Sequence, residues 1–265
     1  MNFLLAPFYS LFSLSFYRKI LSRSLKLGFL YLGYLSLLFS LWALVLFNLR
    51  AVPSIGEFAS WLGANLPKIT LTAQGMRLDP NEPVLLTHPR YGPIFYFDPT
   101  IDAPKPEDFS KALVILTRTK AAFHNPNTGE VRMQSLIPAR PSLGRNEIEI
   151  TGERVTQLWS RAKPFVSLIF FFSGFLGTFF WKLMAALIYS SIGLLWNLFR
   201  KVRLTYGRIL HVTFFALTPM SFWQWLSWQF PALHLPANFL VSLVLTNAYL
   251  AVILFGTQER KPAEN

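Results

Sequence analysis

The sequence predicts an α-helical integral membrane protein of about four transmembrane helices, with a small extracytoplasmic α+β domain inserted between the first two. Hydrophobic residues make up 52% of the 265 residues and charged residues only 14%, whereas soluble chains average about 25% charged residues. Four apolar stretches come close to, or exceed, the roughly 20 residues that a helix needs to cross a bilayer. One region has ordinary soluble composition, because residues 48–163 hold 11 of the 13 acidic residues.

The four apolar stretches define the predicted spans. Residues 27–47 carry no charge and form the clearest span. Residues 209–226 form the third, which we expect Pro219 to kink because proline cannot donate a backbone hydrogen bond, and residues 239–256 form the fourth. Residues 164–199 are longer than one crossing requires, about 54 Å as a helix. We interpret them as one long helix that includes the second span, with two crossings as the alternative.

Basic residues beside the spans predict which ends are cytoplasmic. Short loops rich in Lys and Arg stay on the cytoplasmic side of a membrane. Such residues precede the first span and fill the loop 200–208, whereas the outer loop 227–238 has none. The topology anchors are Arg18, Lys19, Arg23, Lys26, Arg200, Lys201, Arg203 and Arg208. Both termini, including the tail 257–265, are therefore expected in the cytoplasm, at the inner membrane of a bacterium.

The net charge of +12 does not indicate a nucleic-acid partner. Residues 48–163 carry 14 basic and 11 acidic residues, so most of the basic excess lies near the spans. The expected partner of this charge is the lipid bilayer. A membrane or envelope protein is the second partner class that we consider.

Residues 1–26 are expected to form an amphipathic segment in the cytoplasmic interface. Phe3, Leu4, Phe8, Phe12 and Phe16 recur at helical spacing ahead of the basic residues, a pattern typical of helices that lie on a bilayer. A signal peptide has the opposite order, with its basic residues first. A frayed N-terminal extension is the alternative interpretation.

Residues 48–163 are long enough to bury their own core. Ser54 is a candidate N-cap for a helix that Pro67 ends, and a second helix is expected over residues 153–162. Between the helices, β-like runs occupy residues 68–72, 84–88, 94–97, 112–117, 121–124, 131–134 and 147–150. Residues 125–129 predict a hairpin loop. The region is therefore expected to form a small antiparallel sheet with a helix at each end.

The sequence contains no convergent set of catalytic or metal-binding residues. The chain has no cysteine, which excludes disulfides and thiol catalysis. Asp98 and Asp102 form the best carboxylate pair, for which an Asx turn after a strand is the structural alternative. Lys182 is a candidate functional residue because it is ionised within an apolar block, although its place near the expected boundary favours a snorkelling side chain. We expect no catalytic residue, no cofactor and no metal.

These observations favour a non-enzymatic membrane protein whose exported β-rich domain binds a partner protein, an envelope component or a ligand. The first alternative is a transporter or transporter accessory subunit, which predicts a cavity between spans lined by Asn197, Thr213, Thr218 and Asn247. The second is an envelope enzyme that uses carboxylates of the exported domain. It requires at least two groups within about 3–7 Å, chosen from Asp98, Asp102 and His88.

Short motifs in order along the chain indicate a family. They are Phe8-Tyr9-Ser10, Phe16-Tyr17-Arg18, Leu66-Pro67, Gln74-Gly75, Phe97-Asp98-Pro99-Thr100, Leu116-Thr117 and the segment from Phe215 to Pro219. In these motifs the chain resembles the bacterial multipass membrane family catalogued as domain of unknown function 1189, over nearly its whole length. The family's usual Asp-Thr-Thr is here Asp98-Pro99-Thr100. The resemblance implies the membrane architecture and no activity.

Overall fold

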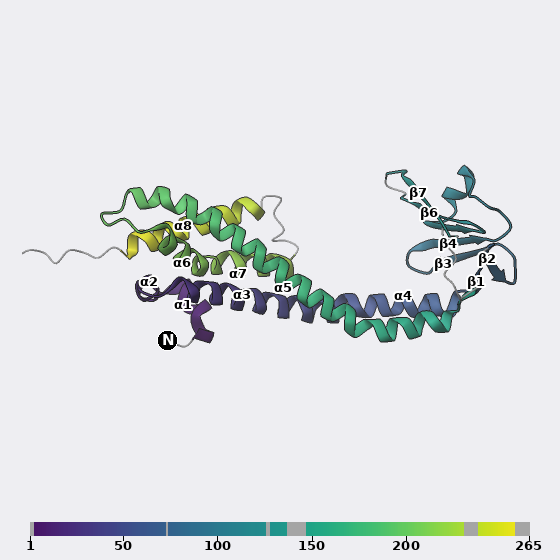
Figure 1. The fold of residues 1–265 in the computed structure, drawn as a ribbon, viewed down its shortest axis with the longest axis horizontal. Coiled ribbons are helices and arrows are strands. Elements are labelled where there is room, and N and C mark those ends of the chain that lie inside the picture. Colours follow the sequence, from purple (N-terminus) through teal and green to yellow (C-terminus); the bar gives the residue numbers. More distant parts are fainter. Residues whose placement is uncertain (1–2, 73, 126–127, 137–146, 231–237, 258–265) are drawn as a thin grey trace, which may run out of the picture. The chain divides into compact units, whose positions relative to one another are not determined.

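The chain divides into two compact units in a computed structural model that describes residues 3–72, 74–125, 128–136, 147–230 and 238–257. The helical unit comprises Met1–Leu46 and Ser167–Asn265, and the sheet unit comprises Phe47–Val166. Strands occur in the second of these units (Figure 1). The chain therefore leaves the helical unit after residue 46, completes the sheet unit and returns to the helical unit at residue 167.

The helical unit is built from short N-terminal helices and longer apolar ones. Its described elements are η1 (Phe3–Leu5), α1 (Ala6–Phe12), α2 (Leu14–Leu21), α3 (Leu25–Leu46), the later part of α5 (Gly152–Leu198), α6 (Tyr206–Ala216), α7 (Thr218–Gln229) and α8 (Asn238–Gly256). Tyr31 stacks on Phe215 in the core, with ring centroids 4.2 Å apart. At Gly28 a Cβ atom would lie only 2.6 Å from the Phe214 ring, so glycine lets α3 and α6 approach closely.

The N-terminal segment packs into this unit as two short helices. Ser13 separates α1 from α2, and its side chain accepts a hydrogen bond from the Phe16 backbone N–H at 3.2 Å, which caps α2. The Tyr17 hydroxyl donates to the Ser10 carbonyl at 2.7 Å. Phe8 and Phe12 remain exposed. The apolar residues predicted to share one face at the membrane interface therefore have different environments, because Phe16 is buried in the core.

The third predicted segment is two helices rather than one kinked helix. Helix α6 ends at Ala216 and α7 begins at Thr218, with Leu217 between them. Pro219 occupies the first turn of α7, where a backbone N–H has no partner within the helix in any case. The proline thus starts a helix instead of bending one.

Two helical stretches in the described residues are long and apolar enough to cross a membrane, Leu25–Asn65 and Gly152–Leu198. The first joins α3 to α4 (Val52–Asn65) through η2, a π-helical turn at Phe47–Ala51. The predicted N-cap at Ser54 is wrong, because the helix continues through it and the Ser54 hydroxyl donates to the Arg50 carbonyl. The wider π turn accommodates Pro53, which would clash in a regular helix interior. Helix α5 is uninterrupted over 47 residues, so residues 164–198 contain no turn.

The sheet unit contains two sheets, and the larger one is mixed. Strands β1 (Lys68–Thr72), β2 (Gly75–Asp79) and β8 (Glu147–Ile150) form an antiparallel sheet in the order β2-β1-β8. The second sheet has the order β3-β4-β5-β6-β7, from β3 (Val84–His88), β4 (Gly92–Asp98), β5 (Val114–Thr117), β6 (Lys120–His124) and β7 (Val131–Ser135). Strands β4 and β5 are parallel, with Phe95 opposite Val114. The expected all-antiparallel sheet is therefore wrong, because the connection through η3 (Pro106–Ser110) returns the chain to the end where β4 began.

The core of the sheet unit lies where both sheets and α4 contribute side chains. Ile69, Met76, Leu78, Leu86 and Phe97 are buried together, with Trp61 and Leu62 of α4 packed against them. Where α4 meets the start of α5, a Cβ atom on Gly152 would lie 1.8 Å from the Gly63 carbonyl oxygen, so these helices touch through their backbones. Gly75 has a φ of 125°, a backbone conformation that residues with a side chain rarely adopt. The backbone N–H of the next residue, Met76, donates to the Arg118 carbonyl at 2.6 Å.

Candidate functional site

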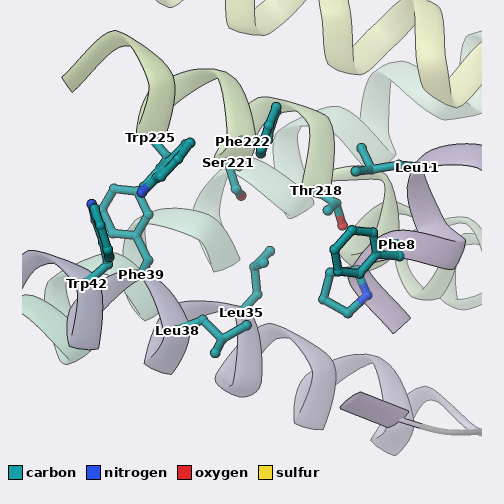
Figure 2. Close-up of a pocket in the computed structure, with 11 residues that line it drawn as sticks. Phe8, Leu11, Leu35, Leu38, Phe39, Trp42, Thr218, Ser221, Phe222 and Trp225 are labelled. Atoms are coloured by element: carbon teal, nitrogen blue, oxygen red, sulfur yellow. The ribbon is translucent and has the colours of Figure 1, made fainter. Parts of the chain in front are cut away.

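The clearest candidate site is an apolar pocket of about 290 Å³ in the helical unit (Figure 2). It lies between α3 and α7, and residues of α1 close one end. The lining residues are Pro7, Phe8, Leu11, Leu35, Leu38, Phe39, Trp42, Thr218, Ser221, Phe222 and Trp225. Its volume is near the lower end of the roughly 300–1,000 Å³ typical of small-molecule sites.

Two helix faces with the same spacing build the pocket walls. On α3 the lining residues are 35, 38, 39 and 42, and on α7 they are 218, 221, 222 and 225. This i, i+3, i+4, i+7 spacing places four side chains on one face of a helix. Each set ends in tryptophan, and the rings of Trp42 and Trp225 lie 5.7 Å apart at one end of the pocket.

Thr218 supplies part of the polar edge of the pocket and is held by a hydroxyl cluster. The hydroxyls of Tyr31 and Thr218 are 2.6 Å apart, and Ser10 Oγ donates to Thr218 Oγ1 at 2.9 Å. Thr218 Oγ1 in turn donates to the Phe215 carbonyl at 2.7 Å. All three side chains are buried, so the cluster fixes α1 and α3 to the start of α7 without any charge.

Ser221 supplies the other polar group, and Lys182 stands behind it. The Lys182 Nζ atom donates to Ser221 Oγ at 2.5 Å and lies 5.5 Å from the centre of the Phe39 ring. Lys182 is only 1% exposed. The predicted snorkelling side chain is therefore wrong: α3 and α7 enclose the ammonium group, and Ser221 satisfies one of its protons.

The pocket combines an apolar volume with two hydroxyls and a nearby cation. In Figure 2 the Ser221 and Thr218 hydroxyls lie on the pocket side of α7, while Leu35, Leu38 and Phe39 face them from α3. Such a site suits a molecule with an apolar chain and one oxygen-bearing group. No group of three or more His, Cys, Asp or Glu side chains that could hold a metal ion occurs within the described ranges.

The carboxylates singled out from the sequence each have a hydrogen-bond or ion-pair partner in the sheet unit. Asp98 forms an Asx turn, accepting from the Thr100 backbone N–H at 2.9 Å, and it also accepts from the Tyr96 hydroxyl. Asp102 pairs with the Arg118 guanidinium at 2.8 Å. His88 lies opposite Gly92, six residues from Asp98 along β4 and thus about 20 Å away. His88 is therefore too far from Asp98 to act with it. The Asp98–Asp102 pair stays a prediction, since Thr117 lies opposite Asp98 and its hydroxyl donates to the Asp102 carbonyl.

The polar residues proposed to line a transport cavity form hydrogen bonds with nearby backbone groups. The Asn197 side chain donates to the Leu204 carbonyl and accepts from the Leu204 backbone N–H. Within their own helices, Thr213 donates to the Ile209 carbonyl and Asn247 to the Leu243 carbonyl. Of the four candidates, Thr218 alone lines the apolar pocket. The apolar pocket is therefore not the cavity that the transporter alternative predicts, and that alternative stays a prediction.

The basic residues proposed as topology anchors have two kinds of environment. Arg18 donates to the Gly256 carbonyl at 3.1 Å, and Arg200 is buried and donates to the Leu254 carbonyl. These two arginines thus bind the last turn of α8, where cations are favoured by the helix dipole. The remaining side chains are exposed, namely Lys19, Arg23, Lys26, Lys201, Arg203 and Arg208.

Sequence reasoning missed Ser221 and the two pocket-lining faces. Ser221 lies in an apolar segment without a neighbouring charge, and its partner Lys182 is 39 residues away. The matched spacing of residues 35–42 and 218–225, each ending in tryptophan, was the available signal. Two of the family motifs do meet here, since Ser10 contacts Thr218.

Fold and site together define a protein with an apolar, pocket-bearing helical unit joined to a mixed-sheet unit. The chain belongs to the family described as protein of unknown function (DUF1189), which matches residues 7–254. No curated protein and no solved structure matches the chain.

Proposed function

We propose that this chain is a non-enzymatic multipass membrane protein that binds the apolar chain of an amphiphile between α3 and α7. The observation that carries the proposal is the apolar pocket, edged by Ser221 and Thr218 and backed by Lys182. Four spans, formed by α3, α5, α6 with α7, and α8, place both termini in the cytoplasm of a bacterium. The sheet unit then lies outside the inner membrane, where its binding of a partner protein or envelope component stays a prediction.

The bilayer placement is supported by apolar surface without a protein cover. None of the most apolar 18-residue window of α5 is buried within the chain. Its exposed side chains include Ile169, Phe172, Phe180 and Ile188, each more than half exposed. Soluble monomers rarely expose so large an apolar surface, whereas lipid covers it without cost. The acid-free composition of Met1–Leu46 and residues 167–257 agrees with this placement.

Binding of an apolar chain is tested with a diazirine-bearing palmitate probe on the full-length protein in detergent micelles. We expect crosslinks at α3 and α7 residues of the pocket, mapped by mass spectrometry. Leu38→Trp should fill the pocket and abolish these crosslinks. Leu37→Trp is the matched control, because Leu37 is also exposed on α3 but does not line the pocket. Equal labelling of both variants would show that the probe reports only general lipid contact.

The orientation is tested by single cysteines in this cysteine-free chain. Thr128, Ser24 and Thr205 are exposed, and replacing them removes no basic residue. In intact cells an impermeant thiol reagent should label Thr128→Cys and leave Ser24→Cys and Thr205→Cys unlabelled until the cells are opened. Labelling at position 205 in intact cells would contradict the four-span arrangement.

A second candidate function arises from the contact between Ser221 and Lys182. A lysine beside a serine can act as the general base of an acyl-transfer enzyme. Against this function, the Ser221 hydroxyl donates to the Leu217 carbonyl at 2.8 Å, which directs its proton away from Lys182. A fluorophosphonate probe distinguishes the two proposals: labelling that disappears in Ser221→Ala supports the enzyme, and no labelling supports binding alone.

A further inference from the structure

A second cavity of about 410 Å³ lies at the end of the helical unit that carries the termini of α2, α5, α6 and α8. Four of its lining side chains are cationic, namely Arg18, Arg200, Lys201 and Arg208. Ser22 and Thr257 add hydroxyls, while Leu21, Val202 and Leu204 supply apolar contacts. The cavity thus combines hydrogen-bond donors with positive charge.

No acidic side chain of the helical unit balances these cations within the described residues. Neither Met1–Leu46 nor residues 167–257 contain Asp or Glu. Four like charges around one cavity repel one another, and this repulsion is removed when an anion binds between them. The charge distribution therefore favours an anionic ligand.

The four cations fall into two pairs. Arg18 and Arg200 already donate to carbonyl oxygens at the end of α8, so a structural role accounts for them. The side chains of Lys201 and Arg208 are exposed and have no hydrogen-bond or ion-pair partner in the part of the chain that is described. Packing among the described residues of the helical unit does not account for this second pair.

We propose that the cavity binds the phosphodiester of an anionic phospholipid, such as phosphatidylglycerol or cardiolipin, from the cytoplasmic leaflet. Arginine and lysine form strong charge-assisted hydrogen bonds with phosphate oxygens, and basic pockets between spanning helices suit lipid headgroups. Phe199 and Val202, 75% and 72% exposed, lie beside the cations and offer contact to acyl chains. The inference rests on the bilayer placement proposed above and does not depend on the apolar pocket.

The test measures lipid binding to the full-length protein in dodecyl maltoside micelles by native mass spectrometry. Phosphatidylglycerol, phosphatidylcholine and inorganic phosphate are titrated in parallel. We expect Lys201→Gln/Arg208→Gln to weaken phosphatidylglycerol binding about tenfold or more, since each basic residue near a lipid headgroup contributes to attraction. The control Lys19→Gln/Arg203→Gln removes the same charge from exposed positions outside the cavity and should change affinity less than about threefold.

A charge-preserving variant separates binding from folding. Lys201→Arg/Arg208→Lys should retain phosphatidylglycerol affinity, with a thermal unfolding midpoint like that of the parent chain. Equal losses in the cavity pair and the control pair would overturn the proposal, since they indicate general surface attraction. Equal affinity for phosphatidylcholine would also overturn it. Displacement of phosphatidylglycerol by an equal concentration of inorganic phosphate would identify a free-anion site and overturn the lipid assignment. Palmitate labelling of the apolar pocket should persist in every variant, so the two proposals fail separately.

Discussion

The two units of this protein use different polar contacts. Among the described residues, ion pairs lie in the sheet unit, at Lys68–Glu149, Lys105–Glu107, Lys111–Asp108, Arg118–Asp102 and Arg132–Glu130. In the helical unit neutral oxygens accept the hydrogen bonds, as where Tyr17 and Tyr249 donate to backbone carbonyls of the N-terminal segment. Its buried Lys182 and Arg200 also donate to neutral oxygens and not to carboxylates. Each set of contacts suits a different solvent.

The difference follows from the energy of moving charge out of water. Exposed ion pairs are cheap to form in water and contribute little, whereas a charge in a low-dielectric interior needs a partner or incurs a large desolvation cost. Neutral hydrogen bonds avoid that cost. Acid and salt should therefore act mainly on the sheet unit, and loss of the partner of buried Lys182 should act on the helical unit. Substitutions that disturb packing should act in either unit.

The largest effect is expected where backbone meets backbone. Gly152→Ala would place a Cβ atom 1.8 Å from the Gly63 carbonyl oxygen, and neither backbone can move aside cheaply. We expect a loss of about 3 kcal/mol or more in the free energy of unfolding, measured by thermal unfolding of the full-length chain in detergent. Gly174→Ala is the control, because nothing lies within 4 Å of its Cβ position. A smaller loss for Gly152→Ala than for Gly28→Ala, whose neighbours are side chains, would contradict this ranking.

The buried ammonium in the helical unit provides the next test. Ser221→Ala removes the group that accepts from Lys182 and leaves a buried charge without that bond. Hydrogen bonds to charged groups are worth about 1.5–3 kcal/mol, so we expect a loss of about 2 kcal/mol in stability. Lys182→Met keeps the side-chain length and removes the charge, and it should cost less than about 1 kcal/mol. If Lys182→Met is the more damaging variant, the ammonium is a stabilising group and the interpretation is wrong.

Lowering the pH should destabilise the sheet unit by protonating Asp108. Burial by itself would raise the pKa of Asp108, but hydrogen bonds from Lys111 Nζ at 2.7 Å and from the Lys105 backbone N–H hold that pKa below its usual value. The stabilisation by ionised Asp108 is therefore complete above its unfolded-state pKa near 4 and is lost as pH falls through the lower folded value. Asp108→Asn should cost about 1 kcal/mol at pH 6 and reduce the loss between pH 5 and pH 3, followed by thermal midpoints. An unchanged acid dependence would exclude Asp108 as the titrating group.

The smallest effect is expected at the pair between Arg132 and Glu130, whose side chains are 78% and 55% exposed. Water and salt screen such a pair. Glu130→Gln should change stability by less than about 0.5 kcal/mol, in the same thermal assay with and without 0.5 M salt. If Glu130→Gln loses more stability than this, and salt lowers the stability of the parent chain by a similar amount, exposed ion pairs contribute more to the sheet unit than we expect.

Local pattern predicts some of these elements and fails for others for physical reasons. The runs at residues 84–88 and 147–150 become β3 and β8 with the same bounds, because turn residues delimit them. The sequence did not predict strand β2, because it starts at Gly75, a residue typical of turns, shortly after the end of β1. The parallel pairing of β4 with β5 depends on the path through η3, and alternation of side chains carries no information about the neighbour in a sheet.

The candidate site shows the same limit. Lys182 stands out in the sequence as a charge within an apolar block, but its burial depends on Phe39 and Ser221, which lie far away in sequence. The Asx turn at Asp98 was predictable, because its acceptor and donor are two residues apart. Local sequence thus indicates contacts within a few residues, while enclosure by distant helices requires the fold.

The contact between the two ends of the helical unit has a consequence for synthesis. Tyr249 in α8 donates to the Leu11 carbonyl across 238 residues. At about 5–20 residues per second, a ribosome needs roughly 12–48 s to add that length of chain. During this interval the N-terminal helices exist without their final neighbour, and their exposed Phe8 and Phe12 can rest against the membrane surface. The segment that contains Leu11 therefore reaches its native environment long after it is made.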